Sequence, residues 1–182
     1  MIFWRKRSCL NTATIGQLCY LWGIGRGRLP VNTISNQVLC KGTNSTAVNF
    51  SGFVPGTVYR WTNDNTSIGL AANGTGNIAA FTTINNGTTP SVANITVTPE
   101  FTYAGKTCYG ISKTFTITVN PVAVANNISN ISVCHNTAVP VTTFSSNISS
   151  GVIYFWTNNT TSIGLAASGS GNLPAFTAVN NG

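Results

Sequence analysis

The sequence predicts an all-β protein, and three observations support this. Almost half of its 182 residues are Asn, Ser, Thr or Gly, which suit strands with polar outer faces and tight turns. Several short segments alternate strictly between apolar and polar residues, the pattern of half-buried antiparallel strands. No segment has the spacing of an amphipathic helix. The length is enough for one mid-sized domain or two small ones.

Three segments carry the clearest strand pattern, namely 57–62, 91–98 and 113–120. In each of them one of the two alternating sets of residues is mostly apolar, and the residues between are mostly Thr, Asn or Arg. The Asn- and Gly-rich segments 73–77 and 85–90 predict turns between strands. The expected apolar faces are formed by Tyr59 and Trp61, by Ala93, Ile95 and Val97, and by Phe115, Ile117 and Val119.

A long internal repeat divides the chain. Residues 61–87 read WTNDNTSIGLAANGTGNIAAFTTINNG and residues 156–182 read WTNNTTSIGLAASGSGNLPAFTAVNNG, an offset of 95. Upstream, 34–40 (ISNQVLC) matches 128–134 (ISNISVC) at an offset of 94. One residue is therefore inserted between the cysteine and the tryptophan of the second copy. A unit of about 95 residues predicts a small β-sandwich domain, because solenoid repeats are shorter.

The repeat predicts three segments. Residues 1–30 match neither copy and are expected to be a poorly ordered basic leader. Residues 31–121 form a complete unit, which ends at Pro121 because proline cannot donate to a β-ladder. Residues 122–182 form an incomplete second unit, without a counterpart to 88–119. We expect this second unit to be the less stable and the sooner cut by a protease, because it would bury too little apolar surface.

Titratable side chains are scarce, which disfavours most catalytic and metal-binding sites. Asp64 and Glu100 are the only acidic residues, and His135 is the only histidine. Glycoside hydrolysis needs two carboxylates across a cleft, and a Ser-His-Asp triad needs a histidine backed by an acid. Calcium and zinc sites need clusters of carboxylates or of Cys and His. The sequence predicts a protein that is not an enzyme and binds no cofactor or metal.

The net charge of +7 belongs mainly to the leader. Five of the nine Lys and Arg residues lie in the first 28 positions, and the other four are scattered. A nucleic-acid-binding face needs clustered basic residues, so we expect no nucleic-acid partner. The apolar residues of the leader are interrupted by polar ones, so that neither a signal peptide nor a transmembrane span is favoured.

The repeated block WTN(D/N)xTSIGLAAxGxGN, followed by two threonine-rich strands, closely resembles the PKD-like domain. Such domains occur in tandem in large secreted and cell-surface proteins of the Bacteroidetes. The resemblance covers about residues 31–182, the first copy fully and the second in part. It implies an immunoglobulin-like antiparallel β-sandwich that serves as a stalk or adhesion module, often in proteins exported by the type IX route.

The resemblance also implies a structural role for four residues. In immunoglobulin-like sandwiches a buried tryptophan packs against a disulfide that joins the two sheets. Cys40, Trp61 and Cys108 would form this arrangement, with the two Cα atoms about 4.4–6.8 Å apart. Trp156 is the counterpart of Trp61 in the second copy. The alternative is that these are independent core residues.

Two functions stay open. The first is a non-catalytic spacer or adhesion module of a larger extracellular or cell-surface repeat protein. Its partners would be neighbouring repeats and surface glycans or proteins. The second is a carbohydrate-binding module of a secreted polysaccharide-active protein, which would need a row of exposed aromatic side chains. The candidates for such a row are Tyr59, Trp61, Tyr154 and Trp156. Strand alternation places Tyr59 and Trp61 on one face, which favours their burial, and the other residues expected to be exposed are Phe53, Tyr103 and Tyr109. The exposure of Trp61 discriminates between the two.

Overall fold

The computed structural model describes residues 29–182, and the expectations for residues 1–28 lie outside the described part. The described chain is mostly β-structure, and it divides into two compact units. Unit 1 comprises 29–85 and Pro90–Asn120, and unit 2 comprises Asn86–Thr89 and Pro121–Gly182. The helical segments within 29–182 are too short to cross a membrane.

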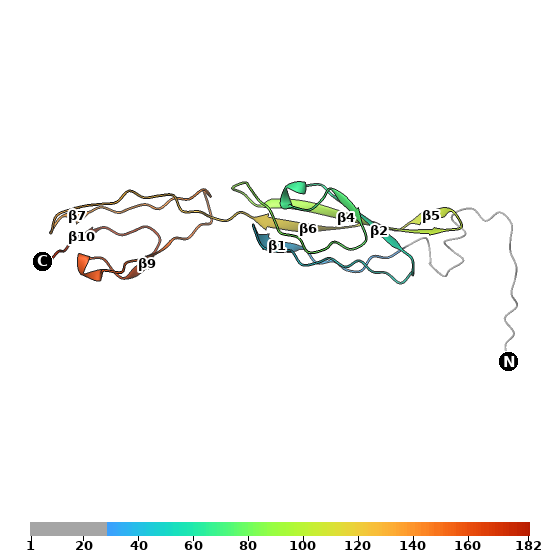
Figure 1. The fold of residues 1–182 in the computed structure, drawn as a ribbon, viewed down its shortest axis with the longest axis horizontal. Helices are drawn as coiled ribbons and strands as arrows, with labels where there is room; N and C mark the ends of the chain where they lie inside the picture. The colour runs from blue at the N-terminus through green and yellow to red at the C-terminus, as the bar shows by residue number, and fades with distance from the viewer. Residues whose placement is uncertain (1–28) are drawn as a thin grey trace, which may run out of the picture. The chain divides into compact units, whose positions relative to one another are not determined.

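Unit 1 is built on one sheet with the strand order β1-β6-β4-β2-β3, in which β5 pairs with the end of β4 (Figure 1). Its strands are β1 Gln37–Cys40, β2 Val58–Asn63, β3 Asn73–Thr75, β4 Ser91–Tyr103, β5 Lys106–Tyr109 and β6 Lys113–Asn120. Strands β1 and β6 are parallel, and the other neighbours are antiparallel. The sheet is therefore mixed, which differs from the purely antiparallel arrangement expected. A parallel pair needs a long connection, and the chain between β1 and β6 supplies one.

The predicted alternation is confirmed in the three central strands. In β2 the side chains of Tyr59 and Trp61 are buried and the residues between are exposed. In β4 and β6 every second side chain from Ala93 and from Phe115 is likewise buried. The opposite face carries hydroxyl pairs across the strands, such as Thr96 with Thr114 at 3.0 Å. One face of the sheet is thus apolar and the other polar.

The apolar face of the sheet is covered by segments from outside it. Val48 and Ile78, which form an isolated β-bridge, are buried in the same cluster as Ile95 and Ile117. The single-turn helix η2 (Thr66–Ile68) adds a fully buried Ile68. The buried side chains of the sheet and of these covering segments therefore form one continuous hydrophobic core in unit 1.

Two features of unit 1 differ from the sequence-based boundaries. Strand β4 runs on to Tyr103 and turns back into β5 through Ala104 and Gly105, both of which have positive φ angles. Such a pair is typical of a two-residue hairpin turn. Leu29, which falls within the expected leader, is 3% exposed. A Cβ atom added to Gly110 would lie 2.7 Å from the Cβ atom of Leu29, so Leu29 packs closely against Gly110 of unit 1.

Unit 2 contains shorter elements. They are β7 Ala138–Val139, β8 Phe155–Thr157, η3 Thr161–Ile163, β9 Ser168–Ser170 and β10 Phe176–Thr177. Strand β7 pairs with β10, and β8 pairs with β9. The second pair has the register of β2 with β3, because Trp156 lies opposite Gly169 as Trp61 lies opposite Gly74.

Backbone hydrogen bonds of unit 1 recur in unit 2. The Asn158 amide donates to the carbonyl of Ala167 at 2.7 Å, as Asn63 donates to Ala72 at the same distance. The Phe144 amide donates to Oδ1 of Asn172 at 3.1 Å, as Phe50 donates to Asn77 at 2.9 Å. Phe144 corresponds to Phe50 at an offset of 94, whereas Asn158 corresponds to Asn63 at 95. The inserted residue therefore lies between Phe144 and Asn158.

Candidate functional site

Trp61 lies in the core of unit 1. Its side chain is 7% exposed, and on β2 it has Gly74 of β3 on one side and Val97 of β4 on the other. The indole lies so close to Gly74 that a Cβ there would meet its Cε2 atom at 2.6 Å. The Nε1 atom is buried, and no described residue accepts its hydrogen bond. Trp61 is therefore a core residue, as strand alternation predicted, and offers no surface to a sugar.

Trp156 repeats this packing with less cover. A Cβ on Gly169 would also meet the Cε2 atom of its indole at 2.6 Å. Its side chain is only partly buried, because β8 has no described strand on the side where β2 has β4. Tyr154, two residues earlier, packs against Phe144 with ring centroids 5.6 Å apart. Neither aromatic residue forms an exposed platform.

The cysteine pairing implied by the resemblance is wrong. Cys40 is an exposed free thiol, and so is Cys134. Cys108 is disulfide-bonded, but not to Cys40. The strand register explains why: Cys40 pairs with Asn120 at the last residue of β6, whereas Cys108 lies on β5 opposite Phe101, beyond the other end of β6. The described part of the chain thus places no disulfide beside Trp61.

The three titratable residues singled out in the sequence belong to different segments of the fold. Asp64 follows the end of β2, whereas Glu100 faces Val58 at the start of β2, about 20 Å away at the rise of a strand. His135 lies in unit 2, where its Nδ1 atom accepts a hydrogen bond from the Asn180 amide at 3.0 Å. Within residues 29–182, no cluster of His, Cys, Asp and Glu could hold a metal ion.

Both carboxylates have structural partners. Glu100 forms an ion pair with Arg60 across the β2–β4 pair. Asp64 accepts hydrogen bonds from the side-chain and backbone nitrogens of Asn94, each at 2.7 Å. These bonds, that of the side chain first, lower the pKa of Asp64 below its ordinary value. The carboxylate is thereby held ionised at the sheet surface, which is the opposite of what a general acid requires.

Exposed aromatic residues occur in unit 1 without forming a row. Phe53, Tyr103 and Tyr109 are 70%, 57% and 65% exposed. Tyr109 lies opposite Glu100, whereas Tyr103 lies opposite Lys106 in the same hairpin. Because side chains alternate along a strand, the two tyrosines point to opposite faces of the hairpin. They cannot stack together on one sugar chain.

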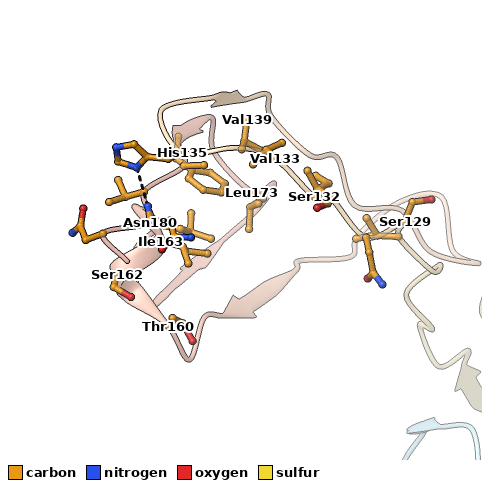
Figure 2. Close-up of a pocket in the computed structure, with 18 of the residues that line it drawn as sticks. Ser129, Ser132, Val133, His135, Val139, Thr160, Ser162, Ile163, Leu173 and Asn180 are labelled. Atoms are coloured by element: carbon orange, nitrogen blue, oxygen red, sulfur yellow. Dashed lines mark hydrogen bonds between the residues drawn. The ribbon is translucent and has the colours of Figure 1, made fainter.

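Unit 2 contains an open groove of about 890 Å³ that the sequence analysis did not predict. Its walls are formed by 128–135, by β7 and by the segments 160–165 and 173–182. In Figure 2, Val133 and Val139 lie on one side of the groove, with Ile163 and Leu173 facing them. Its walls come from segments that lie far apart in the sequence, so that no local pattern predicts it.

Neither a protein-family model nor a curated protein matches the chain. The PKD-like resemblance therefore rests on the quoted motifs alone.

Proposed function

We propose that this chain is a non-catalytic module of an extracellular or cell-surface protein, in which immunoglobulin-like, PKD-like units follow one another and space or display other domains. Its partners would be neighbouring units and surface glycans or proteins. The observation that carries the proposal is the recurrence of one hydrogen-bond framework in two successive units, at offsets of 94 and 95 residues.

Two further observations support this proposal. Asp64, Glu100 and His135 each have a hydrogen-bond or ion-pair partner of their own, which favours a structural protein over an enzyme. Cys108 is disulfide-bonded, and stable disulfides are typical of proteins in oxidising, extracellular compartments.

The strand arrangement of unit 1 suits a spacer that carries tension. When the disulfide of Cys108 is reduced, a pull along the chain acts on the start of β1 and the end of β6, which are parallel neighbours over four register pairs. The two strands must then slide past each other, so that all their hydrogen bonds resist together. The Lys41 amide extends the ladder by donating to the carbonyl of Asn120 at 2.9 Å.

Force spectroscopy on the full chain with its disulfide reduced tests this role, and the ladder supplies a pair of variants for comparison. The backbone N–H group of Lys41 points toward β6. Backbone N–H groups alternate in direction along a strand, so that the N–H of Leu39 also points toward β6 and the N–H of Val38 points away from it. Leu39→Pro removes a load-bearing donor and should lower the unfolding force of unit 1. Val38→Pro should leave the force close to that of the unmodified chain, because an edge strand accepts proline on its open side.

Equal forces for the two variants, or extension of unit 1 without a resolved unfolding peak, would argue against a load-bearing spacer. The alternative is the carbohydrate-binding module, and titration with polysaccharides tests it. Saturable binding that Tyr109→Ala abolishes would favour that alternative, because Tyr109 is among the exposed aromatic side chains of unit 1.

A further inference from the structure

The disulfide partner of Cys108 can be narrowed down by elimination. The sequence contains five cysteines, at positions 9, 19, 40, 108 and 134. Cys40 and Cys134 are free thiols, whereas Cys108 is disulfide-bonded. A bond within the chain therefore leaves Cys9 and Cys19 as the candidates, and both precede the first described residue.

The described part of the chain begins beside the strand that carries Cys108. Leu29 is buried, and a Cβ atom added to Gly110, two residues after Cys108, would lie 2.7 Å from the Cβ atom of Leu29. Cys19 precedes Leu29 by ten residues and Cys9 by twenty. Because ten residues can span up to about 35 Å, either cysteine is within reach of Cys108.

Such a disulfide changes which residues of unit 1 carry tension. With the bond formed, a pull from the amino-terminal side passes from the upstream cysteine to Cys108 and then along 109–120 to Pro121. The residues between the two cysteines, which include β1 and β2, form a closed loop outside this path. Tension therefore does not reach the start of β1, and β1 is not made to slide along β6.

The part of unit 1 that stays in the path has little length to give. Strand β6 supplies eight of its residues and lies between β1 and β4. A strand rises by about 3.3 Å per residue, which is close to the full length of the chain. A pull along β6 therefore stays within the strand and does not require unit 1 to unfold.

We propose that the disulfide of Cys108 with Cys9 or Cys19 is a redox-controlled strap. It makes unit 1 inextensible, and its reduction transfers the tension to the β1–β6 ladder. In the oxidised chain the tension is carried by covalent bonds. In the reduced chain it is carried by the hydrogen bonds of four register pairs, and unit 1 extends when they break. The inference rests on the spacer function proposed above and adds a regulation to it.

The switch needs an external dithiol as its reductant. A thiolate of the dithiol attacks one sulfur of the bond, and the other cysteine leaves as a thiolate that takes up a proton. The second thiol then resolves the mixed disulfide, so that both cysteines become thiols and the dithiol becomes a disulfide. Two electrons and two protons pass to the protein. Cys108 is only half-buried, and among the described strands β5 pairs with β4 alone, so that this part of the fold leaves Cys108 open to attack.

Force spectroscopy on the full chain, attached at its two ends by groups other than thiols, tests the strap. The fully stretched length is measured without reductant and with a dithiol present. Reduction should lengthen the chain by the residues of the loop, which number 89 for a bond to Cys19 and 99 for a bond to Cys9. The expected gain is roughly 300–350 Å, because an extended chain measures about 3.3–3.6 Å per residue.

Two serine variants and a chemical measurement supply the controls. Cys108→Ser removes the strap and should give the longer chain even without reductant. Cys40→Ser removes a free thiol and should leave both lengths unchanged. Peptide mass mapping of the non-reduced protein should find Cys108 joined to Cys9 or to Cys19, and the gain in length should agree with the partner found.

Equal stretched lengths with and without the dithiol would overturn the proposal. So would a Cys108 that is joined to neither upstream cysteine, or a Cys40→Ser chain that is long without reductant. Failure of the spacer function gives a different result, namely reduced chains that lengthen without a resolved unfolding peak. Their gain in length would still confirm the strap.

Discussion

Replacing Gly74 with alanine should destabilise unit 1 by about 1–3 kcal/mol, the usual cost of overpacking a core. A Cβ at this position would meet the Cε2 atom of Trp61 at 2.6 Å, well inside van der Waals contact. The indole is 7% exposed and fixed between β3 and β4, so that it cannot move aside without disturbing Val97. The φ angle of Gly74 is not positive, so that alanine itself is not strained there. The cost is therefore steric.

Urea unfolding of the single and double variants measures this cost. In a Trp61→Phe background the smaller ring leaves room for the methyl group, and the penalty of Gly74→Ala should fall by about 1 kcal/mol or more. Gly76→Ala is the control, because a Cβ there has no neighbour within 4 Å and its cost comes from the φ angle of +74°. That cost should be the same in both backgrounds.

A Gly74→Ala variant within about 0.5 kcal/mol of the unmodified chain, the range of neutral surface changes, would refute the reasoning. An equal penalty in both backgrounds would also refute it, since the steric contact with the indole would then not be its source.

The remaining predictions concern burial, pH and thiol chemistry. Ile68→Ala should cost about 2–5 kcal/mol in denaturant unfolding, whereas Ile163→Ala should cost less than half of that, because its side chain is 37% exposed. The pKa of Asp64 is lower in the folded protein than in the unfolded chain. The hydrogen bonds of its carboxylate therefore stabilise the fold at pH values above the unfolded-state pKa of about 3.9. This stabilisation is lost as the pH falls through the pKa of Asp64 in the folded protein. An NMR titration should show the lowered pKa return toward its ordinary value in Asn94→Ala, and an unchanged pKa would contradict the assigned cause. Alkylation without reductant, followed by mass spectrometry, should label Cys40 fully, and an unlabelled Cys40 would contradict its free state.

The local pattern is sufficient to predict the three central strands and their inner faces. Strict alternation places every second side chain on one side, and in 91–98 and 113–120 the apolar side is indeed buried. The burial of Trp61 follows from the same alternation. The hairpin from β4 to β5 was not predicted, because its turn contains Ala104, and alanine rarely adopts the positive φ angle that this turn requires.

Composition and period-two alternation act locally, and they are therefore sufficient to predict a β-protein with repeated segments and few titratable groups. The parallel pairing of β1 with β6 and the free state of Cys40 depend on which distant segments share a core, so that local patterns could not predict them. The same holds for the groove of unit 2. Its walls come from segments far apart in the sequence, such as 128–135 and 173–182, which only the folded chain brings together.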